Sequence, residues 1–204
     1  MKKLLTLMGI LMLAFVFVGC EPKEEEEDPI DEVELDLALS QEWDGLLEGE
    51  TVYLTTTGQA DIDIVENIIL NGGTEESAYT RNPLLLAADV EDGAVVVLVV
   101  GSSAKGLGAA GTDVNAENVR AQAFAAAANA GDLTLIVVHV GGVGRRGDLS
   151  DTIITSACGG ADLMLVVVTG NADQFFDDFA GTAKPLYQYS TAAKLVPVFT
   201  ALFG

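Results

Sequence analysis

Three runs of apolar, mostly β-branched residues constrain the fold of this chain more than any other feature. They span residues 94–100, 133–140 and 163–169, and polar side chains are rare within them. A strand that reads as a continuous apolar run is buried on both faces, as in parallel sheets that carry helices on each side. The three runs therefore predict the central strands of a parallel sheet.

Between these runs, glycine-rich loops alternate with helical patterns. This alternation predicts one α/β domain over residues 46–204, a three-layer α/β/α Rossmann-like domain with a mostly parallel sheet of about five strands. Outer strands are expected near residues 51–56 and 186–189. Residues 71–92 leave two alternatives open for an edge strand, at 77–81 or at 84–87.

Helices are expected after most of the strands. Asn115 is expected to cap the longest one, and its alanine-rich face should lie against the sheet. Pro197 should kink the last helix or mark its effective start. The expected helices cover residues 60–70, 116–130, 149–157, 172–179 and 191–203, and the alanine-rich face consists of Ala123, Ala126, Ala127 and Ala130.

The first twenty residues have the layout of an export signal. Lys2 and Lys3 precede an uncharged apolar run at 4–18, and Gly19 stands directly before Cys20. This run, at about 15 residues, is shorter than the roughly 20 that a membrane-spanning helix needs. The Gly-Cys ending resembles the lipobox of bacterial lipoproteins. That resemblance implies a signal peptide over 1–19, cleavage before Cys20, a lipid on its sulfur, and attachment to the extracytoplasmic side of a membrane.

An uncleaved amino-terminal anchor is the alternative, and it would also keep the domain tethered and outside. The acidic segment that follows has almost no aromatic residue, so residues 20–45 are expected to form a lipid-anchored, mostly disordered stalk. Since Cys20 would carry lipid, Cys158 has no disulfide partner. Its small and apolar neighbours favour a buried, inert thiol.

Charge excludes one class of partner. The formal net charge of −21 repels phosphate backbones, so nucleic acid is not an expected ligand. Basic residues are sparse in the predicted domain, yet Lys105, Arg145 and Arg146 all follow predicted strands. Because parallel strands end at one edge of a sheet, these cations are expected together at that edge.

The loops that follow the strands carry the unusual residues of the chain. Backbone N–H groups in glycine-rich loops favour anions, and arginine offers a fork suited to carboxylate or phosphate. We therefore expect a small anionic solute to bind there. In the alternative interpretation, Arg145 and Arg146 only neutralise Asp148 and Asp151. The expected ligand-binding residues are Thr57, Gly58, Gln59, Asp61, Ser102, Ser103, Lys105, Gly106, Gly108, His139, Gly141, Gly142, Arg145 and Arg146.

No cofactor is expected. The glycines at 106, 108 and 111 match a dinucleotide-binding pattern, but five residues separate them from the strand end and the next strand ends without an acidic residue. No cluster has the spacing of a zinc site. His139, the single histidine, is a candidate general base, and with Ser102 or Ser103 and Asp151 it would serve a small hydrolase. A third alternative is a protein of the cell envelope that binds a protein partner.

Three segments together resemble an uncharacterised family of bacterial exported domains of unknown function. They are residues 57–61, residues 101–111, and the stretch from His139 to Asp151. The resemblance extends from about residue 50 to the end of the chain. It implies a Rossmann-like fold, often behind a lipoprotein or secretory signal, and it brings no assigned activity.

Overall fold

The computed structural model describes residues 34–181 and 184–204. The expected signal peptide, Cys20 and the first part of the expected stalk lie outside the described residues. Within the described ranges, no helix is long and apolar enough to span a membrane.

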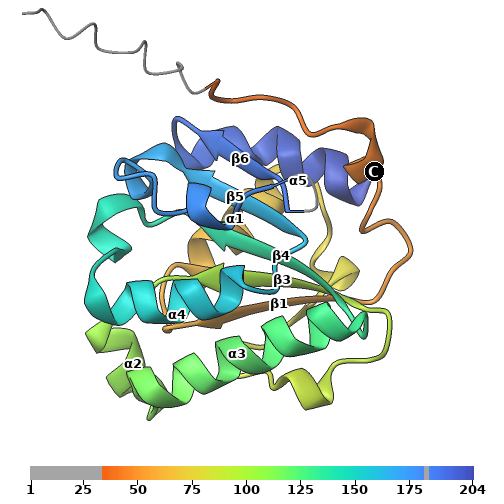
Figure 1. Cartoon of the computed structure of the whole chain (residues 1–204). Coiled ribbons are helices and arrows are strands. Elements are labelled where there is room, and N and C mark those ends of the chain that lie inside the picture. The colour runs from red at the N-terminus through yellow and green to blue at the C-terminus, as the bar shows by residue number, and fades with distance from the viewer. Residues whose placement is uncertain (1–33, 182–183) are drawn as a thin grey trace, which may run out of the picture. The chain divides into compact units, whose positions relative to one another are not determined.

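The core of the domain is a six-stranded sheet in which every pair of neighbouring strands is parallel (Figure 1). This confirms the expected α/β fold, with one strand more than the five expected. The additional strand, β2, contains only two residues. It lies within 77–81, the first of the two alternatives for an edge strand in residues 71–92. In the order β2-β1-β3-β4-β5-β6, the strands are β2 (Thr80–Arg81), β1 (Val52–Thr57), β3 (Val95–Val100), β4 (Thr134–His139), β5 (Leu163–Val167) and β6 (Leu186–Tyr189).

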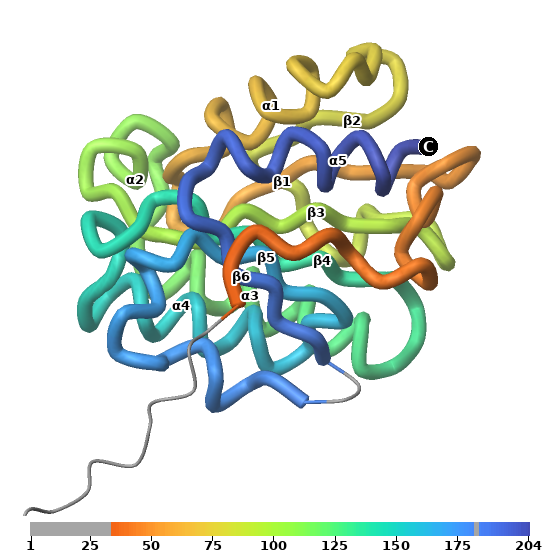
Figure 2. Tube along the Cα trace, turned by 90° about the horizontal axis from the view of Figure 1, so that it is seen from above, coloured from red at the N-terminus to blue at the C-terminus, as the bar shows by residue number. Residues whose placement is uncertain are grey.

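Helices cover both faces of the sheet (Figure 2). On one face, α1 (Ile62–Asn71) contacts α5 (Val196–Phe203), and on the other α3 (Val114–Ala130) contacts α4 (Asp148–Cys158). A short helix, α2 (Ala104–Ala110), precedes α3. Every side chain of β3 and β5 is buried, as expected for strands covered on both faces. Single 3-10 turns lie at Gln41–Trp43, Glu76–Ala78, Ala87–Asp89, Gly142–Arg145, Val168–Gly170, Asp177–Phe179 and Ala192–Leu195.

The longest helix, α3, differs in detail from the expectation. Its cap is Asp113, whose carboxylate accepts from the N–H of Ala116 at 2.9 Å, and not Asn115. The buried face is formed by Glu117, Ala121, Phe124 and Ala125, while Ala123, Ala126 and Ala130 are exposed. Burying the ring of Phe124 removes far more apolar surface from water than burying alanines does, and this sets the rotation of the helix.

The expected helix at 172–179 is wrong. Only a 3-10 turn forms at its end, Asp177–Phe179. The amide oxygen of Asn171 accepts from the N–H of Phe176 at 2.7 Å, and Gln174 has a positive φ of 60°. Asn and Asp side chains that bond to nearby N–H groups compete with helix formation, and here that competition wins.

The ordered domain begins earlier than residue 46. Residues 34–47, which we call the amino-terminal strap, pack beside β6 and α5 (Figure 2). The N–H of Asp36 donates to Gln188 O at 2.9 Å, and the N–H of Gly45 donates to Ala201 O at 2.8 Å. Leu47 is buried in the core. The expected stalk is therefore too long by about twelve residues at its carboxyl end, because apolar side chains among the acids find a surface to cover.

Candidate functional site

The expected loops do meet at one edge of the sheet. From β1 the chain adds β2 on one side and then β3 to β6 on the other, so the strand order reverses between β1 and β3. Ligands of open α/β sheets bind beyond the carboxyl ends of the strands at such a reversal. The loops after β1, β3 and β4 surround this point.

The loop after β1 has an unusual backbone. Gln59 and Asp61 both have positive φ values, 57° and 61°. Residues other than glycine seldom adopt this conformation, which costs of the order of 1–3 kcal/mol each and persists only where the surroundings enforce it. Such strain clusters at functional sites, and this loop contains two of the four residues other than glycine that have a positive φ in the described part of the chain.

A buried ion pair on α3 holds the strained loop. The Glu117 side chain is fully buried, and its Oε2 accepts from Gly58 N at 2.9 Å and from Gln59 Nε2 at 3.1 Å. Arg120 Nη1 donates to the same oxygen at 2.7 Å and to Thr56 O at 3.2 Å. Neither Glu117 nor Arg120 was among the expected site residues. The signal available in the sequence is that they are the only charged residues of α3 and share a face with Phe124.

The crevice between β1 and β3 is filled by the loops themselves. Gly58 O accepts from Ser103 N at 3.0 Å, and a bridge joins Gln59 to Ser102. A Cβ atom on Gly58 would collide with the backbone of Gly101, so only glycine fits. Thr57, the last residue of β1, is fully buried. A ligand therefore has access to the outer surface of the loops and not to the space between the strands.

Arg145 is a cation of the site that keeps free hydrogen-bond donors. Its Nε donates to both carboxylate oxygens of Asp61, at 3.1 and 3.2 Å. The Arg145 side chain is 37% exposed, whereas that of Asp61 is 7% exposed. In the part of the chain that the structure describes, the two terminal nitrogens of Arg145 have no hydrogen-bond partner. The carboxylate thus orients the guanidinium and leaves its outer fork free.

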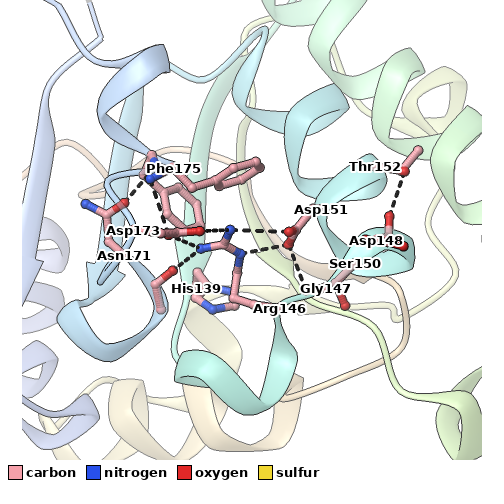
Figure 3. Close-up of polar contacts among 12 residues, drawn as sticks. His139, Arg146, Gly147, Asp148, Ser150, Asp151, Thr152, Asn171, Asp173 and Phe175 are labelled. Atoms are coloured by element: carbon pink, nitrogen blue, oxygen red, sulfur yellow. Dashed lines mark hydrogen bonds and ion pairs between the residues drawn. The ribbon is translucent and has the colours of Figure 1, made fainter.

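Arg146 has no such freedom, as Figure 3 shows. Its donors go to both oxygens of Asp151, both oxygens of Asp173, and Gly170 O. A guanidinium has five N–H donors, and these five contacts use them. The side chain is 9% exposed. Arg146 therefore joins the loop after β4 to α4 and to the segment after β5. Asp173 was not among the expected site residues, because no local sequence pattern indicates it.

His139 is enclosed at the end of β4. It is fully buried, with Nδ1 3.0 Å from Val100 O and Nε2 3.2 Å from Gly142 O. Burial lowers its pKa below the usual 6.5, against the effect of those two carbonyls. Both ring nitrogens face backbone oxygens, so the structure does not bring His139 to Ser102 or Ser103. The expected arrangement of His139 with one of these serines is therefore not formed.

The remaining expected residues line the outer surface. Ser102 N donates to Ser150 Oγ at 2.9 Å, and Ser103 Oγ accepts from Gly106 N at 3.2 Å. Gly106 and Gly108 belong to α2, not to an extended loop. A hollow of about 490 Å³ opens beside them, lined by Ser102, Ala104, Arg146 and residues 147–150.

The structure thus brings together most of the expected residues and separates a few. Lys105 and Gly108 are exposed on α2, and Lys105 makes no hydrogen bond or ion pair within the described ranges. Gly141 lies against Arg145, where a Cβ atom would collide with the arginine side chain and with Asp61. Among the residues that the structure describes, no group of three His, Cys, Asp or Glu side chains could hold a metal ion.

Comparison with known proteins gives a family and no assigned activity. Residues 49–203 match the model of a domain of unknown function, DUF6305. Neither a curated protein nor a solved structure matches the chain. The matched segment contains the whole sheet and every loop described above, and it confirms the expected kinship with an uncharacterised domain. This chain therefore belongs to the DUF6305 family.

Proposed function

We propose that this protein is a non-enzymatic binding module, tethered to the extracytoplasmic side of a membrane, that takes up a small anionic solute. The observation that carries the proposal is the guanidinium of Arg145, oriented by Asp61 and free at its two terminal nitrogens. A planar fork of this kind suits a carboxylate or a phosphate group.

The negative charge around Arg145 favours a small ligand over an extended polyanion. Asp61 lies beside the fork of Arg145, and the formal net charge of the whole chain is −21. An extended polyanion would be repelled by this field, while a single carboxylate or phosphate ester can reach one arginine. Exposed Lys105 adds a second positive charge on the same edge of the sheet.

The test is thermal unfolding in the presence of an anion panel. Short carboxylates and phosphate esters should raise the Tm, and Arg145→Ala should abolish the increase while the apo protein stays folded. Arg145→Lys should recover only part of it, since an ammonium lacks the fork. Arg81→Ala is the matched control, because it removes one exposed arginine at a different edge. A panel without any shift in the wild-type protein would rule out the proposal.

The tether is tested separately. The lipobox-like Gly19-Cys20 pair supports lipid attachment at Cys20, so cells grown with a clickable fatty acid should label the wild-type protein and not Cys20→Ser. Membrane fractionation should show the Cys20→Ser variant released, and its retention on the membrane with an uncut signal would contradict the lipid anchor. Equal labelling of both proteins would contradict the lipoprotein assignment and leave the binding site unaffected.

A further inference from the structure

A second hollow lies on the far side of the sheet from β2, under the amino-terminal strap. It encloses about 250 Å³ between Leu37, Ala38 and Leu39 of the strap and Tyr189, Val198 and Ala201 of β6 and α5. This is slightly below the roughly 300–1,000 Å³ of pockets that take drug-sized ligands. The space thus suits a smaller molecule with an apolar body.

The strap is attached at both ends of this hollow. Near one end Ser190 N donates to Asp36 Oδ1 at 2.8 Å, and near the other Gly45 N donates to Ala201 O at 2.8 Å. Between them Ser40 N donates to the Tyr187 hydroxyl at 3.0 Å. These hydrogen bonds fix the strap against β6 and α5, so both walls of the hollow are held in place.

The junction of strap and domain contains buried polar atoms that lack partners. Within the described part of the chain, Trp43 Nε1 and the Tyr189 hydroxyl are buried without a hydrogen bond. Such atoms are uncommon in folded proteins, and each one calls for a missing partner. Tyr189 belongs to the wall of the hollow, so its hydroxyl is a polar atom without a partner at this site, and Trp43 lies in the strap next to Asp44.

Charge at the rim selects the sign of the ligand. Lys194 is offset by Asp36, with Nζ and Oδ2 3.7 Å apart. The Asp44 carboxylate is exposed, and no donor or cation among the described residues pairs with it. The rim therefore carries one uncompensated negative charge within an acidic domain, which favours a cation and disfavours an anion.

We propose that this hollow binds a small organic cation, with its apolar part between Leu37 and Val198 and its ammonium group beside Asp44. The site is separate from the anion site and has the opposite charge preference. It also lies largely outside the anion-binding loops, because its walls come from the strap, the end of β6 and α5.

A ligand series with one body and three head groups tests the proposal. Pentylamine, pentan-1-ol and pentanoate are titrated into the domain, with binding followed by calorimetry and by fluorescence of Trp43, the only tryptophan in the chain. Pentylamine should bind saturably and about 1.4- to five-fold more tightly than the alcohol, the range for one exposed charge pair. Pentanoate should bind most weakly.

Variants assign the effect to the hollow. Asp44→Asn should reduce amine affinity to that of the alcohol, while Leu37→Ser and Ala201→Leu should weaken both ligands by changing the apolar wall. Arg145→Ala should leave all three affinities unchanged, so loss of the anion site and loss of this one are distinguishable. The proposal is overturned by the absence of saturable amine binding in calorimetry, by equal binding of all three ligands, or by an amine preference that survives in Asp44→Asn.

Discussion

The guanidinium carbon of Arg146 lies 4.0 Å from the centre of the Phe175 ring. This cation–π contact adds to the five hydrogen bonds of the same side chain, which connect three segments at the carboxyl edge of the sheet (Figure 3). Arg146 was a ligand candidate in the sequence, but in the structure its side chain stabilises its own loop. The neighbouring Arg145 is the arginine whose terminal nitrogens are free to bind a ligand.

Replacing Arg146 should destabilise the domain. Arg146→Ala removes the partner of two carboxylates, and because Asp173 is largely exposed the loss should be about 2–3 kcal/mol, below the 3–5 kcal/mol of a fully buried pair. Urea unfolding of the folded domain measures it. Arg146→Lys should recover less than half, since one ammonium cannot replace the fork. Arg81→Ala removes an exposed ion pair and should cost under about 1 kcal/mol. Equal losses in Arg146→Ala and Arg81→Ala would contradict this account.

The buried pair on α3 should behave as a unit. Glu117→Gln leaves Arg120, whose side chain is 10% exposed, without its countercharge, and should cost about 3–5 kcal/mol. The double variant Glu117→Leu/Arg120→Leu should lose less than the sum of the losses in Glu117→Leu and Arg120→Leu. A double-mutant cycle in urea measures this coupling. Strict additivity would mean that the ion pair does not hold the loop after β1.

His139 should make stability depend on pH near neutrality. Its pKa is lowered in the folded state, so the unfolded chain binds the proton first and stability falls as pH drops below the unfolded value of about 6.5. Between pH 7.5 and 5.5 the loss should reach at most about 1.4 kcal/mol, one pKa unit being equivalent to 1.36 kcal/mol. His139→Asn should flatten this dependence in urea titrations at the two pH values.

The interpretation of that experiment is simple because the chain has one histidine. Asp36 and Asp173 have pKa values below the usual 3.8, so both carboxylates stay ionised between pH 5.5 and 7.5 and do not contribute to the change in stability. If the variant retains the full slope of the wild-type protein, His139 is not the group responsible.

Cys158 should be unreactive in the folded protein. Burial raises the pKa of its thiol to about 12, so almost no thiolate is present at pH 8. In a Cys20→Ser background, a chromogenic disulfide reagent should label Cys158 only after urea is added, at a rate that follows unfolding. Rapid labelling without denaturant would show that the pocket around Cys158 opens in the native state.

The sheet was predictable from sequence because β3, β4 and β5 are covered on both faces and contain almost nothing polar. Helix α2 was missed since Gly106 and Gly108 are poor helix formers; the cap at Ser103 and Gly111 in the left-handed conformation define it. The false helix at 172–179 shows the opposite error, where side-chain bonds of Asn171 override a helical pattern.

The candidate site was predictable only as a location. The pairing of Arg146 with Asp151 is local, five positions apart, and was the alternative left open by the sequence. The pairing of Arg145 with Asp61 joins positions 84 apart and depends on the strand order, which no local pattern specifies. The two adjacent arginines therefore have different roles that only the fold distinguishes.

The amino-terminal strap has a mechanical consequence. A force that pulls on the amino end would load its attachments one after another, first Asp36 on β6, then Ser40 on Tyr187, and then Gly45 on α5. Hydrogen bonds that are loaded one at a time break at a lower force than the bonds of a sheet that is sheared along its strands, where many bonds are loaded together. In a pulling experiment the strap should detach first as a small early rupture, and the sheet would remain intact while the outer edge of β6 becomes uncovered.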